Sequence, residues 1–192
     1  MKQKIALEIL KTGRNVFITG SAGTGKTYLL NKYINYLKNR RINPVVLAPT
    51  GIAASHINGM TIYSFFALGV REKLSDTQIK FLIKQKFVKS RLERLKVLII
   101  DEVSMISPDL FETINKILQK FKNSKKPFGG VQVVLSGDFF QLPPISKQIR
   151  EEKFIWQTFL WKTADFKICY LEEKFRQNDS GLIQILDEIR QG

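Results

Sequence analysis

Cysteine and histidine are almost absent from this chain of 192 residues, in which Cys169 and His56 are the single representatives. With one thiol the chain can form no internal disulfide and no cysteine metal cluster, and nothing in its cysteine usage suggests export. His56 has no partner histidines or cysteines, so we do not expect it to bind a metal. Cys169 lies in an apolar stretch and is expected to be a buried packing residue.

Long apolar runs are missing as well. No run approaches the roughly 18 residues of a membrane span, and the N-terminal segment lacks the apolar core of a signal peptide. Hydrophobic residues nevertheless make up 44% of the chain, and its length is ordinary for one α/β domain with a sizeable core. We therefore expect a single lobe over residues 1–192 that is soluble, intracellular and without a membrane partner.

Acidic residues are scarce in the first part of the chain. Residues 1–71 hold ten Lys and Arg but one acid, Glu8, which gives a net charge of +9. Residues 151–192 hold six bases and eight acids, which gives −2. One-sided positive charge of this kind is typical of proteins that bind a polyanion. A generally lysine-rich surface would produce the same total, so charge alone does not decide the partner.

Repeats, linkers and low-complexity segments are also lacking, and candidate strands alternate with candidate helices. This alternation predicts an α/β fold with a mainly parallel central sheet and helices on both faces. Short apolar runs rich in β-branched residues predict buried strands at residues 15–19, 44–48, 97–101, 131–136 and 166–171. Helical spacing predicts helices at residues 26–38, 77–95, 108–122 and 181–190, and residues 123–130 are expected to form a loop.

A glycine-rich motif follows the first predicted strand and precedes a predicted helix. It is a complete P-loop in its confirming context, and we expect all eight of its residues to bind phosphate: Gly20, Ser21, Ala22, Gly23, Thr24, Gly25, Lys26 and Thr27. The glycines let backbone N–H groups approach phosphate oxygens, and the helix adds its positive N-terminal end. Lys26 would neutralise the β- and γ-phosphates of ATP, and the Thr27 hydroxyl would hold Mg²⁺.

Two carboxylates follow the buried run that ends at residue 100. Asp101 and Glu102 would therefore lie at the carboxyl edge of the sheet, where ligands of open α/β sheets bind. We expect Asp101 to hold Mg²⁺ through water and Glu102 to act as the general base that polarises the attacking water. The pair favours ATP hydrolysis over phosphate transfer to a small acceptor.

Signatures of other P-loop classes are absent. The chain has no Asn-Lys-x-Asp motif, which a GTPase would use to recognise its base, and no Leu-Ser-Gly-Gly-Gln signature of a transporter ATPase. Both classes are therefore excluded.

Residues 133–144, which include Gly137, Asp138, Gln141 and two prolines, are similar to motif III of RecD-like DNA helicases of superfamily one. The chain most resembles the Pif-one family. Six further motifs follow the family order: a Q motif at Gln3, the P-loop, residues 48–54, residues 59–66, residues 101–105 and residues 175–177. The resemblance covers nearly the whole chain and implies a RecA-like P-loop NTPase lobe.

The resemblance also implies roles for individual residues. Gln3 would contact the adenine, Gln141 would sense the γ-phosphate, and Arg176 would act as an arginine finger; a salt bridge of Arg176 with Glu172 or Glu173 is the alternative. Hydroxyls and backbone N–H groups would contact the phosphates of single-stranded DNA, and one aromatic ring would stack on a base. The residues implied are Pro49, Thr50, Gly51, Thr61, Ser64 and Phe65. Phe65 and Phe66 could instead belong to the core.

The chain departs from the family pattern at two positions and in length. Tyr63 stands where the family usually has His, and His56 where Asn is common, so the strand contact at Tyr63 stays open. After residue 192 the family continues into a wedge and a second motor lobe, which would be the missing partner of this lobe. The resemblance implies movement 5′ to 3′ on single-stranded DNA. We expect a cytoplasmic protein, nucleoid-associated if bacterial, and a monomer.

Alone, the lobe is expected to hydrolyse ATP slowly and not to unwind DNA, because the cleft that surrounds the nucleotide in two-lobed motors is open on one side. Two other functions stay open. A DNA-binding module could use nucleotide as a structural switch without turnover, although Glu102 and Arg176 argue against it. A phosphotransferase would need an acceptor lid, for which residues 71–94 form the only segment of sufficient length.

Overall fold

Six parallel strands form one sheet in this computed structural model, which describes residues 1–144 and 154–173. Their order across the sheet is β3-β2-β4-β5-β1-β6. The strands are β1 (Val16–Thr19), β2 (Val45–Ala48), β3 (Met60–Thr61), β4 (Val97–Ile100), β5 (Gln132–Ser136) and β6 (Lys167–Tyr170). Every pairing is parallel. The five predicted strands are confirmed to within one residue at each end, whereas β3 was not predicted.

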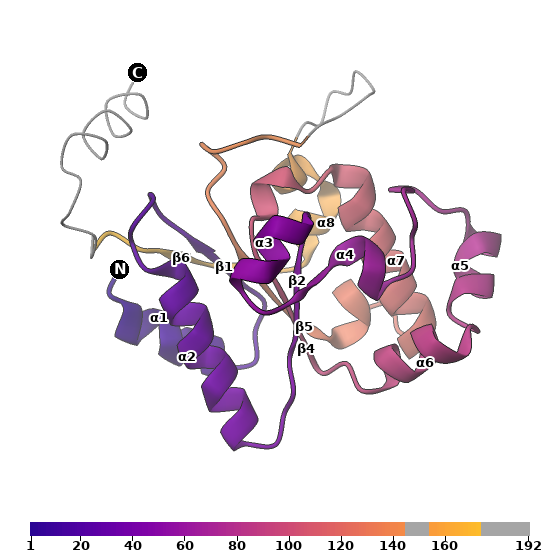
Figure 1. Cartoon of the computed structure of the whole chain (residues 1–192), viewed down its shortest axis with the longest axis horizontal. Coiled ribbons are helices and arrows are strands. Elements are labelled where there is room, and N and C mark those ends of the chain that lie inside the picture. The colour runs from indigo at the N-terminus through magenta and orange to yellow at the C-terminus, as the bar shows by residue number, and fades with distance from the viewer. Residues whose placement is uncertain (145–153, 174–192) are drawn as a thin grey trace.

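Eight α-helices lie in the described part of the chain (Figure 1). They are α1 (Gln3–Lys11), α2 (Lys26–Asn39), α3 (Gly51–His56), α4 (Ile62–Phe65), α5 (Asp76–Leu82), α6 (Lys86–Glu93), α7 (Pro108–Lys122) and α8 (Phe159–Thr163). Short 3₁₀ turns occur at η1 (Val103–Met105), η2 (Pro127–Gly130) and η3 (Ile155–Gln157). Pattern reasoning found α2 and α7 but not α1, α3, α4 or α8. The helix predicted for residues 181–190 lies outside the described residues.

The single helix predicted for residues 77–95 is wrong, because this stretch forms α5 and α6 with a break between them. Ser75 starts α5 with a capping box, and Gln85 in extended conformation starts α6. Leu82 and Val88 are both buried in the same core. Six residues make about one and two-thirds turns, so one straight helix would place these two side chains on different faces. The break allows both to be buried.

The loop predicted for residues 123–130 is also only partly correct. Its first half is irregular, but Pro127–Gly130 forms the turn η2 beneath α7. Phe128 is fully buried there against Phe111, with their ring centroids 5.4 Å apart. The Asn115 side chain accepts a 2.7 Å hydrogen bond from the Phe128 backbone N–H. These contacts with α7 order the segment. They could not be predicted from the local sequence pattern.

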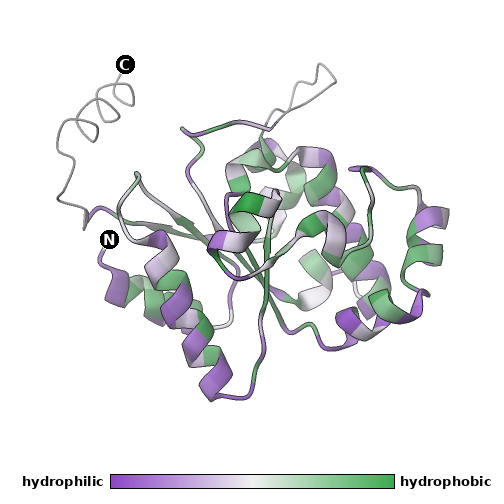
Figure 2. Cartoon of the chain, in the orientation of Figure 1, coloured by the Kyte–Doolittle hydropathy of each residue, from purple (hydrophilic) through white to green (hydrophobic). Residues whose placement is uncertain are grey.

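Helices cover both faces of the sheet, as predicted. Along β4, Val97 and Ile99 pack with α1 and α2, while Leu98 and Ile100 pack with α4 to α8. Alternate residues of the strand are therefore buried on opposite sides. Figure 1 shows α1 and α2 on one side of the sheet and α4 to α7 on the other, and Figure 2 shows the sheet between them as predominantly hydrophobic.

Cys169 is buried beside α1 and α2, which confirms the packing role predicted for it. In residues 1–144 and 154–173, no helix has the length and apolar character needed to cross a lipid bilayer.

Candidate nucleotide site and strand-contact surface

The P-loop connects β1 to α2 and is closed by hydrogen bonds within itself. The Thr24 side chain donates to the Ser21 carbonyl at 2.8 Å, and Gly25 caps α2 in the left-handed conformation at φ 80°. Gly20 has φ 149°, and a Cβ there would lie 2.5 Å from the Leu171 carbonyl oxygen on the neighbouring β6 side. A side chain at Gly20 would collide with backbone, so the loop needs glycine at this position.

The Lys26 ammonium lies against the loop that precedes it. Its Nζ donates to the carbonyls of Gly20 at 2.8 Å and Ser21 at 3.2 Å. The next residue, Thr27, is exposed in the first turn of α2. A positive side chain, an exposed hydroxyl and the positive end of a helix therefore meet at one point, which is the chemistry of an anion site.

Gln3 lies at the same loop although it is 21 residues away from it. Its amide nitrogen donates to the carbonyls of Thr24 at 3.2 Å and Gly25 at 3.4 Å. Helix α1 packs on α2, which brings the amide to the loop. The structure thus places Gln3 with the predicted phosphate-binding residues.

The second predicted group follows β4 at the same edge of the sheet. Asp101 is 7% exposed, and its backbone N–H donates to the Leu47 carbonyl at 3.0 Å, which extends the pairing of β4 with β2. Glu102 then turns the chain into η1 with φ 52° and ψ 44°. A non-glycine residue in this left-handed region costs about 1–3 kcal/mol, and such residues cluster at functional sites.

Burial raises the pKa of Glu102 above its ordinary value, and the nearby charge of Asp101 raises it further. Lys26 opposes this effect, Asp138 adds to it, and His56 lowers the pKa slightly. The carboxylate is therefore more basic than that of an ordinary glutamate. Higher basicity suits a group that must accept a proton from water near neutral pH.

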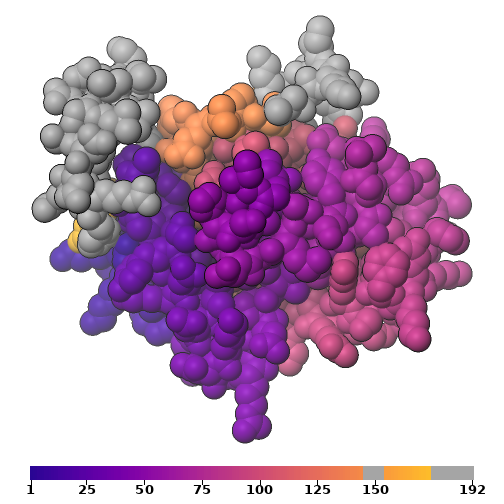
Figure 3. Space-filling model, viewed as in Figure 1, coloured from indigo at the N-terminus to yellow at the C-terminus, as the bar shows by residue number. Residues whose placement is uncertain are grey.

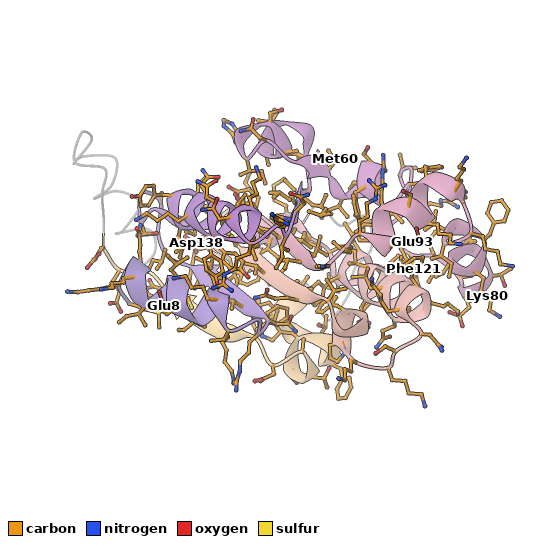
Figure 4. The ribbon with its side chains drawn as sticks, turned by 90° about the horizontal axis from the view of Figure 1, so that it is seen from below. Glu8, Met60, Lys80, Glu93, Phe121 and Asp138 are labelled. Atoms are coloured by element: carbon orange, nitrogen blue, oxygen red, sulfur yellow. The ribbon has the colours of Figure 1, made fainter. Side chains whose placement is uncertain are left out.

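Asp138 was not predicted as a site residue, although it lies in the same cluster. It follows β5, is 3% exposed, and accepts a 3.2 Å hydrogen bond from the Phe140 backbone N–H. The signal was present in the sequence, because Asp138 follows a buried strand just as Asp101 does. Figure 4 shows Asp138 far from Lys80 and Glu93, which belong to α5 and α6.

The turn after β5 packs directly against the turn after β4. A Cβ at Gly137 would lie 2.9 Å from the Val103 backbone nitrogen. Gln141 follows this turn with an exposed side chain, and its backbone N–H donates to the Asp138 carbonyl at 2.9 Å. Arg176, the predicted arginine finger, lies outside the described residues.

The predicted strand-contact residues gather at the starts of two short helices. Thr50 caps α3 by accepting from the Ala53 N–H at 3.2 Å, and Thr61 caps α4 by accepting from the Ser64 N–H at 3.1 Å. Pro49 and Gly51 flank the first cap, and Ser64 is exposed beside the second. In the space-filling view, α3 lies on the face turned to the viewer, just below the orange segment that ends at residue 144 (Figure 3).

Phe65 corrects one of these predictions, because its ring is only 4% exposed. It packs edge-on against the fully buried Phe66, with ring centroids 4.9 Å apart. A buried ring cannot stack on a base, so both phenylalanines belong to the core. Arg91 of α6 donates to the carbonyls of Ser64 at 2.8 Å and Phe65 at 3.0 Å. The sequence did not predict this support of α4, because Arg91 lies 26 and 27 residues away from the carbonyls that it contacts.

Comparison with known proteins identifies the family. The model of the PIF1-like helicases matches residues 1–190. The chain belongs to the PIF1-like helicase family. Two relatives are the ATP-dependent DNA helicases Pif1 of Psychrobacter sp., 47% identical over 99% of this chain, and PIF1 of Emericella nidulans, 39% identical over all of it. The chain spans 30% and 27% of the lengths of these relatives.

Solved structures of PIF1-like helicases share the fold. The Pif1 helicase of Candida albicans has a TM-score of 0.85 and 37% identity, covering 98% of this chain and 43% of that one. A Bacteroides Pif1 in complex with ADP-AlF3 and single-stranded DNA has a TM-score of 0.82 and 38% identity, covering 98% and 45%. The predicted family and the predicted RecA-like lobe with a parallel sheet are therefore confirmed.

Proposed function

We propose that the chain is the ATP-binding lobe of an ATP-dependent DNA helicase that moves 5′ to 3′ along single-stranded DNA. The direction of movement rests on the family alone. The observation that carries the ATPase assignment is the convergence of three features at the carboxyl ends of the neighbouring strands β4, β5 and β1: the P-loop, buried acids, and Glu102 with its raised pKa. Ligands of open parallel sheets bind at this edge.

The donors at this edge fit Mg²⁺. Asp101 offers a carboxylate and Thr27 an exposed hydroxyl, and Mg²⁺ prefers oxygen ligands, keeps several waters and takes few protein groups beside the phosphates. The ion would neutralise charge on the β- and γ-phosphates. Lys26 would exchange its two carbonyl partners for phosphate oxygens and bring a second positive charge.

Glu102 would accept a proton from the water that attacks the γ-phosphate. Gln141 would sense the γ-phosphate through its amide, which can donate to phosphate and accept from water. Arg176 would add fixed positive charge to the transition state. Gln3 would contact the adenine from its position beside the P-loop.

Single-stranded DNA would cross the caps of α3 and α4. The exposed or half-exposed residues there offer backbone N–H groups and hydroxyls to phosphates, namely Pro49, Thr50, Gly51, Thr61 and Ser64. The net charge of +9 over residues 1–71 supports this surface. A Bacteroides Pif1 of the same fold has been solved with single-stranded DNA.

Residues 1–192 tested alone should hydrolyse ATP slowly and fail to separate strands. In two-lobed motors the nucleotide lies between the lobes, and stabilising charge reaches the γ-phosphate from both sides. Preorganised electrostatics is usually the largest catalytic contribution. A missing arginine contact can cost roughly 10³- to 10⁵-fold in rate, so one open side should lower turnover by orders of magnitude.

Two variants test the site assignment. Lys26→Ala should abolish binding of a fluorescent ATP analogue, because it removes the charge that faces the phosphates. Glu102→Gln should bind the analogue as well as the unchanged chain but lose turnover by roughly 10²- to 10⁴-fold, because it removes only the general base. Calorimetric titration and phosphate release measure the two effects.

Lys38→Ala is the matched control, since Lys38 is exposed at the far end of the same helix α2. It should bind and hydrolyse normally. Equal loss of binding in the Lys26 and Glu102 variants would refute the assigned roles. Normal turnover in Glu102→Gln would refute the role of Glu102 as general base. Nucleotide binding without any turnover in the unchanged chain would favour the alternative in which nucleotide serves only as a structural switch.

A further inference from the structure

The Glu72 carboxylate bridges two segments that belong to different parts of the proposed site. One of its oxygens accepts a hydrogen bond from the Tyr63 hydroxyl at 3.0 Å. The other accepts from the Ser107 hydroxyl at 2.7 Å. Glu72 itself lies between α4 and α5, in a stretch without regular secondary structure. Its position is therefore defined by these two side chains rather than by a helix or strand.

Tyr63 attaches this bridge to the strand-contact surface. It lies inside α4, between the cap Thr61 and the exposed Ser64. Burial raises the pKa of Tyr63 to about 12, and the charge of Glu72 adds to the rise. The phenol is consequently protonated at any working pH and is a constant donor to Glu72. A shift of α4 on binding a strand would move this donor.

Ser107 attaches the bridge to the turn that carries Glu102. Ser107 is 7% exposed and caps α7 by accepting from the Leu110 N–H at 3.2 Å. Only η1 and Ile106 separate it from Glu102. Val103 in η1 is fully buried and meets Gly137 closely, so this turn has little room to adjust by itself. A displacement of Ser107 is therefore passed to the backbone on either side of it.

We infer that Glu72 is a positioning residue that couples the strand-contact helix α4 to the turn carrying Glu102. Hydrogen bonds to a carboxylate are about twice as strong as neutral ones and hold a defined geometry. Two such bonds on one carboxylate join segments that are 44 residues apart, from Tyr63 to Ser107. The inference rests on the proposed function, because it assumes that α4 meets DNA and that Glu102 serves the nucleotide.

The experiment measures coupling between the two ligands on residues 1–192. Affinity for a fluorescent oligothymidylate is determined with and without a saturating non-hydrolysable ATP analogue. Typical couplings between two sites change affinity about 5- to 150-fold, and we expect at least about fivefold for the unchanged chain. Glu72→Gln and Tyr63→Phe should each bring the factor close to one. In Glu72→Gln, affinity for either ligand alone should stay within about twofold.

Two controls separate coupling from mere structural support. Ser107→Thr keeps a hydroxyl donor toward Glu72 and should retain most of the coupling, in contrast to Ser107→Ala. Glu93→Gln removes an exposed carboxylate whose ion pair with Lys89 is 3.9 Å long and should change nothing. The double variant Tyr63→Phe/Glu72→Gln should lose no more coupling than either single one, because both remove the same bridge.

Each outcome bears on one proposal or the other. Unchanged coupling in Glu72→Gln and Tyr63→Phe overturns the role of Glu72 and leaves the proposed function standing. A parallel fall in thermal stability and in affinity for both ligands in these variants also overturns it, because Glu72 would then only stabilise the fold. An unchanged chain that binds neither nucleotide nor oligonucleotide overturns the proposed function itself.

Discussion

The nucleotide edge and the strand-contact helix α4 are built in opposite ways. At the nucleotide edge, the P-loop bonds to its own carbonyls, and the acids follow within two residues of strands that are almost entirely buried. Helix α4 has only four residues, and its carbonyls are held by Arg91 from α6, 26 and 27 residues away. The hydrogen bonds that shape the P-loop thus come from neighbours in sequence, whereas those that hold α4 come from a helix that only folding brings close.

The largest effect should come from a change in the backbone of the nucleotide edge. Gly20→Ala places a Cβ 2.5 Å from the Leu171 carbonyl oxygen, at φ 149°. Overpacking costs about 1–3 kcal/mol, and a non-glycine residue in such a conformation costs about 1–3 kcal/mol more. Urea unfolding should show a loss of that combined size, a large part of a typical stability of about 5–15 kcal/mol. Nucleotide binding should be lost as well.

Gly13→Ala is the control for Gly20→Ala. Gly13 also has positive φ, at 78°, but nothing lies within 4 Å of a Cβ built there. It should lose only the cost of the left-handed conformation, about 1–2 kcal/mol, and keep nucleotide binding. Similar losses in the two variants would show that the contact with Leu171 is not what constrains the loop.

A smaller effect is expected at the strand-contact helix. Arg91→Ala removes two hydrogen bonds to the carbonyls of Ser64 and Phe65. One of these bonds is exposed to solvent and the other is partly buried. A hydrogen bond from a charged group contributes about 1.5–3 kcal/mol when buried, so with solvent screening we expect about 1–2 kcal/mol in total. Affinity for oligothymidylate should fall while affinity for the ATP analogue holds.

Two further variants refine this comparison. Arg91→Lys should recover only part of the loss, because a lysine cannot present two fixed donors to neighbouring carbonyls. Arg94→Ala, at an exposed position just after α6, should change neither stability nor binding. A loss of nucleotide affinity in Arg91→Ala equal to the loss of DNA affinity would contradict the separation of the two regions.

The smallest effect concerns the pH dependence of the nucleotide edge. Glu102 must be ionised to accept a proton, so turnover should fall as pH drops through its pKa. Because burial and Asp101 raise that pKa, the fall should begin at higher pH than for an ordinary glutamate, whose pKa is about 4.3. The plateau at high pH should be unaffected.

Asp138→Asn should move this acid limb to lower pH, because Asp138 is one of the charges that raise the pKa of Glu102. Profiles of kcat/KM against pH report the free enzyme and measure the shift. A limb that does not move in Asp138→Asn, or that persists in Glu102→Gln, would mean that another group controls the rate.

Much of the fold was accessible from local pattern. Strands β1, β2, β4, β5 and β6 are short apolar runs between polar turns, and each was predicted to within one residue. Strand β3 has two residues, too few to give a pattern, and it exists because it pairs with β2. Helix α4 has four residues, about one turn, and was also missed. The two longest helices, α2 and α7, were predicted from their periodicity, whereas α1 with nine residues was missed.

The site divides along the same line. The P-loop, Asp101 and Glu102 follow from motifs because each lies where a buried strand ends. The burial of Phe65 could not be predicted, since a phenylalanine beside another on a short helix fits either a core or a base-stacking position. Asp138 was overlooked although it obeys the rule that found Asp101. Its closeness to Glu102 depends on which strands are neighbours, and that is a property of the sheet.

The amino-acid sequence by itself determined the parallel α/β lobe, the phosphate-binding loop and the order of the family motifs, because these depend on residues close together in the chain. Only the tertiary structure decided that Glu72 joins Tyr63 to Ser107, that Arg91 holds α4, and that Asp138 lies near Glu102. Such contacts form when distant segments pack on a shared sheet. Their geometry is set by the packing of the whole domain and leaves no periodic trace in the sequence.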